Sequence, residues 1–393
     1  MKLIRLEETE QSLKTMSLAG EDGSSHQKES KFPFRVVTSK SSLDKFLSPP
    51  ITPMKARAVK SFPIGKEWMY EPKWDGFRCL VFRNEENIFL QSKVGKSLTS
   101  GFPEIVAAFR DLSPKRFVLD GELAMPAANG FSFDALVNRL RIGSARLALE
   151  VRDSPAIYIV FDMLANSENL LGSPFRVRRK NLERFFEDSV PRSAPLYLSA
   201  STADLREVEK WVGHIGQQLD GIIAKRADAP YRPGDDHSTV KIKNYRSADC
   251  VIGGFRDHSI GSARNELLLG LYDQKGHLQY VSSVGIDAKQ KQQVGILRPK
   301  KKTTFYGRQP GEKSHWSGEA VGPWKHVAPT KVVEVRYDHF SDHRFRHGCT
   351  FLRVREDKLP KECLLEQVVE HTSLQNINAF IEAGLATAGP NRK

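Results

Sequence analysis

The chain has 393 residues, of which 39% are apolar, and this length allows two or three domains with cores of their own. Sixty Lys and Arg residues against 47 Asp and Glu give a net charge of +13; because no run of 18 apolar residues is present, this charge favours a nucleic-acid partner over a membrane. The charged N-terminus argues against a signal peptide, and four cysteines without a C-x-x-C pair argue against a disulfide framework or a zinc site, so we expect a cytoplasmic protein with reduced thiols.

The first two thirds of the chain predict an α+β arrangement. Residues 1–46 are polar and lack a sustained period, which predicts a flexible extension, and a proline-rich lead-in follows. From about Trp68 to Arg246 the pattern predicts antiparallel strands with flanking helices. Strands are expected over 68–83, 88–98, 116–126 and 156–164, and helices over 174–189 and 202–218.

From about Ala248 the pattern changes to short strands separated by turns. These strands are expected over 250–256, 266–273, 278–285, 331–338 and 350–357. Five of them predict a small closed β-barrel such as an OB-fold. A helix and a loop over 289–329 interrupt the strands, and a short helix is expected over 374–386. We therefore expect four parts of the chain: the N-terminal extension (1–46), the α+β domain (47–246), the β-barrel domain (247–370) and a C-terminal tail (371–393).

A lysine stands two residues before an Asp-Gly pair in EPKWDGFRCLVFR, residues 71–83. Asp-Gly between β-forming residues is a strong hairpin signal. The pattern therefore predicts a turn at Asp75-Gly76 that presents Lys73.

Two other stretches invite interpretations that the residues do not support. KVGKS, 93–97, is similar to a phosphate-binding loop, but Leu90 stands where that signature needs glycine, so a hairpin turn at Val94-Gly95 is expected instead. His339, His343 and His347 are spaced as metal ligands on a helix would be, but they follow a predicted strand. Solvated or phosphate-facing histidines are expected rather than zinc ligands.

Several acidic and basic pairs recur at the ends of predicted strands. Each pair is a weak signal on its own. Alternation places Lys241 and Lys243 on the same side of one strand, where their mutual repulsion favours a shared anion over a structural role. The other pairs are Asp120 with Glu122, Phe161 with Asp162, and Asp220 with Lys225.

Taken together and in order, these segments resemble the nucleotidyltransferase motifs of the ATP-dependent DNA ligases. The resemblance covers about 47–370 and is greatest to the short bacterial ligase C type, which is similar to the ligase part of ligase D. It implies an adenylation domain with antiparallel sheets followed by an OB-fold barrel. The matching segments are Lys73 to Arg78, Ser92 to Gly95, Asp120 to Glu122, Phe161-Asp162, Asp220 to Lys225, Lys241 to Lys243, and Arg355 to Lys358.

The resemblance implies that Lys73 attacks the α-phosphate of ATP and becomes a lysyl-adenylate. AMP then passes to the 5′-phosphate at a nick, and the 3′-hydroxyl displaces it. A free lysine has a pKa of about 10.4, so the nucleophile needs a depressed pKa. Lys241, Lys243 and a magnesium or manganese ion would supply positive charge, and Trp74 and Phe161 would help to exclude water.

The resemblance also implies roles for the remaining motif residues. Lys241 and Lys243 would bind the α-phosphate, and Asp220 with Glu122 would hold the metal. Glu122 or Arg78 would hold the ribose, Phe161 would stack on adenine, and Glu71 would lie near its amino group. Arg355, Asp357 and Lys358 would move in to orient pyrophosphate and move away when DNA binds. Lys93, Arg139 and Arg78 would contact the DNA.

Two positions depart from the family pattern. Asp220 stands where many ligases have Glu, which puts the metal ligation in doubt, and Lys93 stands where Arg is common, which loses a bidentate phosphate contact. We expect a monomer that acts on nicked duplex DNA at the bacterial nucleoid. A repair polymerase and a Ku-type end-binding protein are candidate partners. An RNA ligase, another nucleotidyltransferase or an inactive DNA-end-binding module are the alternatives.

Overall fold

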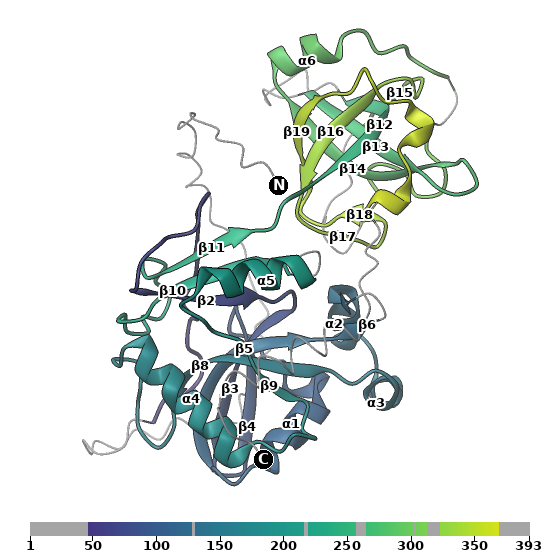
Figure 1. Cartoon of the computed structure of the whole chain (residues 1–393). Coiled ribbons are helices and arrows are strands. Elements are labelled where there is room, and N and C mark those ends of the chain that lie inside the picture. Colours follow the sequence, from purple (N-terminus) through teal and green to yellow (C-terminus); the bar gives the residue numbers. More distant parts are fainter. Residues whose placement is uncertain are drawn as a thin grey trace, which may run out of the picture. The chain divides into compact units, whose positions relative to one another are not determined.

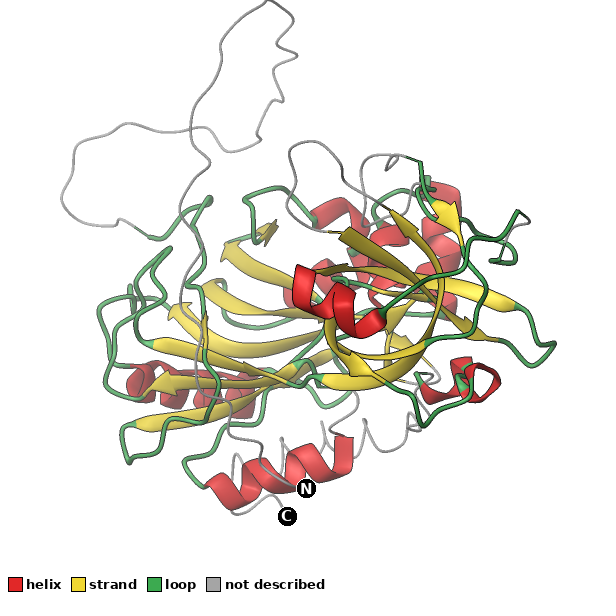
Figure 2. Cartoon of the chain, turned by 90° about the horizontal axis from the view of Figure 1, so that it is seen from above, coloured by secondary structure: helices red, strands yellow, loops and turns green. Residues whose placement is uncertain are grey.

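The computed structural model describes residues 46–127, 130–215, 219–256, 265–301, 304–312 and 323–368. Residues 1–45 and the helix expected over 374–386 lie outside the described residues. Strands predominate over helices in the described chain, as Figure 2 shows in yellow and red. The α+β composition that the sequence predicts is therefore confirmed. No described helix is both long enough and apolar enough to span a membrane.

A five-stranded sheet has the strand that carries Glu122 at its centre. All neighbouring strands pair antiparallel except β8 and β9, which are parallel. The apolar faces of helices α1 (Pro103–Arg110) and α4 (Phe175–Ser189) pack on this sheet. The bounds of α4 agree closely with those of the helix expected over 174–189. The strand order is β4 (Asn87–Ser92), β3 (Phe77–Asn84), β5 (Arg116–Ala124), β8 (Ile157–Ala165) and β9 (Leu196–Leu198).

A four-stranded sheet carries the lysine motifs (Figure 1). β10 pairs antiparallel with both of its neighbours, and the short β1 runs parallel to β11. Helix α5 (Leu205–Ile215) lies next to β2, and its Val208 and Trp211 belong to the same apolar core as Tyr70 and Ile222. The order is β1 (Arg57–Ala58), β11 (Thr239–Lys243), β10 (Gly221–Arg226) and β2 (Trp68–Lys73).

The chain crosses between these two sheets immediately after Lys73, so the predicted hairpin at Asp75-Gly76 is wrong. β2 ends at Lys73 and belongs to the four-stranded sheet, whereas β3 begins at Phe77 in the five-stranded sheet. A Cβ on Gly76 would lie 2.0 Å from the Leu123 carbonyl oxygen, so glycine is needed for this close approach.

The turn predicted at Val94-Gly95 is confirmed. The Ser92 amide donates to the Lys96 carbonyl, and the Gly95 amide donates to Ser92. Gly95 has a φ of 82°, which glycine adopts without strain.

Short elements lie between the strands β5 and β8 of the five-stranded sheet. β6 (Pro126–Ala127) pairs with β7 (Gly130–Phe131), and α2 (Phe133–Arg139) and α3 (Ser144–Asp153) follow. The Ser132 hydroxyl accepts from the Ala135 amide and begins α2 as an N-cap. A 3₁₀-helix, η1 (Thr99–Gly101), precedes α1.

All five strands predicted after Ala248 are present, but the predicted closed barrel is wrong. Among the described residues, the outer strands β14 and β19 form no hydrogen-bonded ladder with each other, so the sheet is open. Closure depends on strand tilt and register, which an alternating apolar pattern does not specify. The order is β14 (Leu278–Ile286), β13 (Asn265–Tyr272), β12 (Arg246–Arg256), β16 (Val332–Tyr337) and β19 (Thr350–Val354), and β15 (Lys325–His326) pairs with β12.

The remaining elements lie around this third sheet. Helix α6 (Ala288–Val294) follows β14 and is capped by Asp287. β17 (Phe340–Ser341) and β18 (Arg344–Phe345) form a small hairpin between β16 and β19. Two 3₁₀-helices end the described chain: η2 (Pro360–Glu362) and η3 (Leu365–Gln367).

Candidate active site

A cavity of about 1080 Å³ is lined by residues of both N-terminal sheets. Strands β2, β10 and β11 contribute one side, and β3, β5 and β8 contribute the other. Most of the predicted site residues meet here. Those that line the cavity are Glu71, Lys73, Arg78, Lys93, Glu122, Arg139, Phe161, Asp220 and Lys241.

Lys73 and Asp220 form an ion pair at the ends of adjacent strands. The Asp220 amide donates to the Lys73 carbonyl at 3.0 Å, which fixes the two residues side by side. The next residue, Gly221, has a φ of 140°, and a Cβ there would lie 2.0 Å from the Ile242 carbonyl oxygen. Burial acts to raise the pKa of Asp220, but a hydrogen bond from His339 and the charge of Lys73 outweigh it and hold that pKa well below its usual range.

Arg78 and Glu122 are paired across β3 and β5. The Arg78 guanidinium donates to both carboxylate oxygens of Asp120, at 2.5 and 2.6 Å, and the Tyr231 hydroxyl donates to Asp120 at 2.7 Å. Asp120 is fully buried and therefore acts as an anchor for Arg78. Burial raises the pKa of Glu122 to about 8 against the opposing charges of Lys73 and Arg78.

Phe161 and Glu71 lie on another part of the cavity wall. The Phe161 ring centroid is 4.7 Å from the Arg78 guanidinium carbon and 4.8 Å from the Lys225 Nζ. Glu71 is 2% exposed and accepts from Lys225 at 2.7 Å. Burial raises the pKa of Glu71, and the charges of Lys225 and Arg179 oppose that rise.

The three lysines expected to bind phosphate have different surroundings. Lys241 lines the cavity, and burial together with the charges of Lys73, Lys243 and Lys93 lowers its pKa. Lys93 lines the cavity from the turn after β4. Lys243 does not line it, and its Nζ donates to Asp338 at 2.9 Å. Lys243 therefore has its charge balanced within the protein.

Comparison with known proteins identifies the family. Residues 53–243 match the model "ATP dependent DNA ligase domain", and residues 261–358 match "ATP dependent DNA ligase C terminal region". DNA ligase C1 of Mycolicibacterium smegmatis is 37% identical over 340 residues, which cover 83% of this chain and 96% of the relative. The chain belongs to the ATP-dependent DNA ligases.

More distant members of the family also match the ligase. The multifunctional non-homologous end joining DNA repair protein LigD of Mycobacterium tuberculosis is 29% identical over 305 residues, 76% of the ligase and 38% of LigD. The crystal structure of the M. tuberculosis LigD ligase domain is 28% identical, covers 80% of the ligase and 98% of that domain, and has a TM-score of 0.44.

The predicted residues of the REDK segment are not part of the cavity wall of the ligase. Arg355 donates through Nη1 to both oxygens of Asp249, at 2.9 and 3.0 Å, and through Nε and Nη2 to Asp357, both at 2.8 Å. Lys358 lies 3.6 Å from Asp249. The segment is thus organised around the carboxylate of Asp249, a residue of β12 that no motif predicted.

Arg139 reaches the cavity wall but is only 2% exposed. Its guanidinium donates to Glu104 at 2.9 Å and to the carbonyl oxygens of Glu150 and Ser154 at 3.2 and 2.6 Å. These bonds connect α1, α2 and α3. In this structure the Arg139 side chain therefore makes its hydrogen bonds inside the protein, where it holds the three helices together.

Sequence reasoning missed a group of residues that follows β16. Arg346 donates to both oxygens of Asp75, at 2.7 and 2.9 Å, and the His339 Nε2 lies 2.8 Å from Asp220. His339 is buried, so the expectation of a solvated side chain is wrong for it, although His343 and His347 are exposed as expected. The only signal for this group was the D-H-F-S-D-H-R-F-R-H run, whose partners lie far away in the sequence.

Asp220 and Glu122 suit a magnesium ion that is held together with phosphate. Mg²⁺ binds through one or two carboxylates and substrate phosphates and keeps several waters. Both carboxyls line the cavity, and the partly buried Glu122 has a charged form that a cation would stabilise. This donor set fits Mg²⁺ or Mn²⁺.

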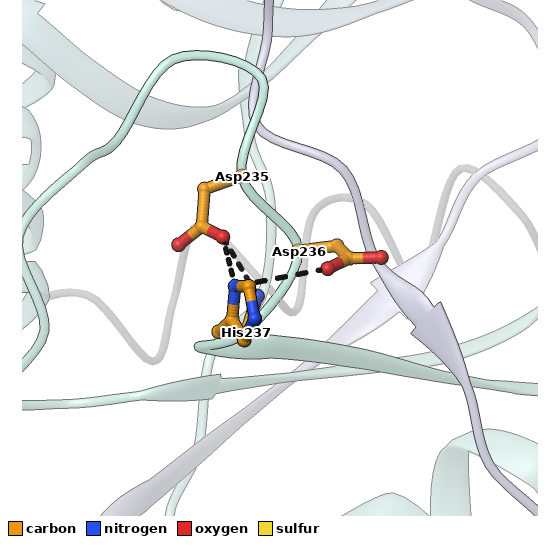
Figure 3. Close-up of side chains that lie close together, drawn as sticks. All are labelled: Asp235, Asp236 and His237. Atoms are coloured by element: carbon orange, nitrogen blue, oxygen red, sulfur yellow. Dashed lines mark hydrogen bonds and ion pairs between the residues drawn. The ribbon is translucent and has the colours of Figure 1, made fainter.

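Within the described ranges, one group of three side chains brings possible metal ligands together: Asp235, Asp236 and His237, in the loop before β11 (Figure 3). The His237 ring pairs with Asp235 and lies 3.9 Å from Asp236. The hydrogen bond that the His237 ring donates to the Asp235 carboxylate raises the pKa of His237, which favours imidazolium. A protonated ring has no lone pair for a metal, so we interpret the group as an ion-paired loop.

Proposed function

We propose that the ligase seals nicks between a 5′-phosphate and a 3′-hydroxyl in duplex DNA, with ATP as the AMP donor and Lys73 as the AMP carrier. The observation that carries this proposal is the position of Lys73. It ends β2 at the cavity, beside the Asp220 carboxylate and with Lys241 on the same wall. A lysine so placed is suited to act as a nucleophile toward a bound phosphate.

The reaction has three transfers. The Lys73 Nζ loses its proton to water and attacks the α-phosphorus, and the bond to pyrophosphate breaks. A 5′-phosphate oxygen of DNA then attacks the same phosphorus, and Lys73 leaves as the amine. The 3′-hydroxyl finally attacks the 5′-phosphorus, a phosphodiester forms, and AMP leaves.

Phosphoryl transfer depends mainly on positioned positive charge. We assign Lys241, which lines the cavity, to the α-phosphate. Lys243 is assigned to the same phosphate through its positive charge, which acts on Lys241 although its Nζ donates to Asp338. Asp220 and Glu122 would hold Mg²⁺ or Mn²⁺, which supplies charge neutralisation at the phosphates. Asp220 is one methylene shorter than Glu and pairs with Lys73, so the same carboxylate would have to serve both Lys73 and the metal.

For the nucleoside we assign Arg78 and Glu122 to the ribose, Phe161 to stacking on adenine and Glu71 to the adenine amino group. The Asp120 anchor supports Arg78 in this role, because it fixes the guanidinium at the cavity. The same assignment makes the N-terminal sheets a nucleotidyltransferase domain over about 47–246, with a second domain over 247–370.

We assign Lys93 and Arg78 to contacts with DNA phosphates at the nick. Arg139 is assigned an indirect role, because it holds α1 and α3 together beside the cavity. Arg355, Asp357 and Lys358 act on pyrophosphate, which requires the REDK segment to move to the cavity during adenylation. The name of LigD supports the proposal of a role in end-joining repair. We further propose that the ligase is a monomer that acts at the nucleoid together with a repair polymerase or a Ku-type protein.

The proposal is tested by incubating the full chain with α-labelled ATP, GTP or NAD⁺ and magnesium. Labelled ATP is expected to leave label on the protein, and chelation of the metal with EDTA is expected to prevent it. Addition of nicked DNA should discharge the label and produce a sealed strand. Label from GTP or NAD⁺ alone, or sealing of an RNA nick in preference to DNA, contradicts the proposal.

Binding to nicked duplex is expected to weaken steeply with salt, because each phosphate contact releases condensed counterions. The measurement is a titration of labelled nicked DNA at several salt concentrations. Lys93→Met should reduce the slope of log K against log[salt] by about 1, since one phosphate contact is lost. The exposed Lys115→Met, 46% exposed in its side chain, should leave the slope unchanged. A flat salt response contradicts the assignment of a phosphate-binding surface.

A further inference from the structure

Lys225 is a buried lysine of β10 to which none of the assignments above gives a role. It is 9% exposed and lines the cavity. Its Nζ lies 2.7 Å from the Glu71 Oε2 of β2 and donates to the Phe161 carbonyl oxygen of β8 at 3.2 Å. The same atom is 4.8 Å from the Phe161 ring centroid and 4.0 Å from the Asp162 carboxylate. One ammonium group thus connects strands of the two different sheets.

Glu71 uses only one of its carboxylate oxygens within the protein. Oε2 accepts from Lys225, whereas Oε1 is buried and has no hydrogen-bond partner among the described residues. The Arg179 Nη1 lies 3.9 Å from Oε1, too far for a hydrogen bond. A buried acceptor without a donor is costly, and Glu71 lines the cavity. Oε1 is therefore suited to accept a hydrogen bond from a bound ligand.

We infer that Lys225 is a positioning residue that makes the ligase selective for adenine, because it keeps the Glu71 carboxylate ionised and directs Oε1 to the exocyclic amino group of the base. This inference rests on the proposed function. Adenine presents an amino donor at this position, and guanine presents a carbonyl acceptor, which a carboxylate repels. Lys225 also donates to the Phe161 carbonyl oxygen, so the residue assigned to stacking on the base is held by the same ammonium group.

Loss of Lys225 removes the partner of Oε2 and leaves a buried carboxylate. The charge of Arg179 remains at a distance, and burial then favours the protonated acid. A carboxylic acid can donate to a guanine carbonyl, which a carboxylate cannot. Selectivity between adenine and guanine should fall even if the fold is intact, because the chemistry of one oxygen has changed.

The experiment compares initial rates of label transfer to the full chain from α-labelled ATP and α-labelled GTP. Lys225→Met is expected to lower the ATP-to-GTP ratio of kcat/KM by about tenfold or more, the value of a charged hydrogen bond. Glu71→Gln is expected to have a similar effect, and the double variant should differ from Glu71→Gln by less than about twofold. Lys225→Arg, which keeps the charge, should restore most of the ratio. Lys115→Met, in which an exposed lysine is removed, should leave it unchanged.

Thermal melting identifies variants that fail to fold. If Lys225→Met does not fold, Lys225→Gln, which keeps a donor without the charge, carries the same expectation of a reduced ratio. An unchanged ratio, with labelling by both nucleotides reduced equally, overturns the inference and leaves Lys225 a structural residue. Failure of the parent enzyme to accept label from ATP would instead overturn the proposed function, so the two failures are distinguishable.

Discussion

Lys73→Ala is expected to reduce label transfer from α-labelled ATP to the protein by more than about a thousandfold, since removal of a covalent nucleophile leaves only binding. Alanine has no group that can attack phosphorus, and no other lysine on the cavity wall occupies the end of β2. The measurement is the labelled protein band after a fixed time with magnesium. Lys241 remains in this variant, so ATP is still expected to bind.

Two controls make this result specific. Lys66→Ala removes an exposed lysine shortly before β2 and should label as well as the parent. A nick that already carries AMP on its 5′-phosphate bypasses the first two transfers, and Lys73→Ala should retain measurable sealing of it. Normal labelling of Lys73→Ala would show that another residue carries AMP.

Arg178→Met is expected to lower the free energy of unfolding by about 3–5 kcal/mol, because it leaves a buried carboxylate without its partner. Arg178 donates to both oxygens of Asp162, at 2.8 and 2.9 Å, and to the carbonyl oxygen of Ser173 at 2.6 Å. Both members of the ion pair are almost fully buried. Denaturant unfolding checks the change, and Arg152→Met, at a surface ion pair, should leave the midpoint unchanged.

The same ion pair predicts a pH dependence. Burial acts to raise the pKa of Asp162, but Arg178 outweighs it and holds that pKa below its ordinary value. A carboxyl with a depressed pKa stabilises the fold above its unfolded-state pKa, about 3.9, and loses that contribution as the pH falls through the folded-state value. Arg178→Met lacks the charge that lowers the pKa of Asp162, so the difference between the parent and this variant should be larger at pH 7 than at pH 4 and should shrink as the pH falls toward the parent's folded-state pKa. A difference that is constant across this range would contradict the assignment.

The sequence predicted the strands and the residues that line the cavity better than it predicted the connections between strands. Lys73, Asp220 and Lys241 come from three short motifs, and the pairing of β2, β10 and β11 brings them together. Each motif sits at a strand whose apolar neighbours predict it, so local pattern was sufficient. Adjacent predicted strands were not necessarily partners, however, and Asp75-Gly76 therefore suggested a hairpin where the chain changes sheets.

The contacts that were missed depend on tertiary structure. Arg346 reaches Asp75 across 271 positions, and no local period signals such a bond. Arg139 lies at the end of α2, and its burial follows from the packing of α1 and α3 around it. Whether β14 and β19 pair depends on the tilt and stagger of the strands across the whole sheet, which alternation along one strand does not encode.

The crossover at Gly76 explains why the number of residues between Lys73 and Phe77 matters for the structure. Three residues, from Trp74 to Gly76, are all that joins the last residue of one sheet to the first residue of the next. The segment is short and its glycine has no room for a side chain, so it limits the distance between the end of β2 and the start of β3. The separation of Lys73 and Arg78, which lie on opposite sides of the cavity, is thereby limited by the chain itself. Insertion of a single residue here would put the two walls of the cavity out of register while leaving each sheet intact.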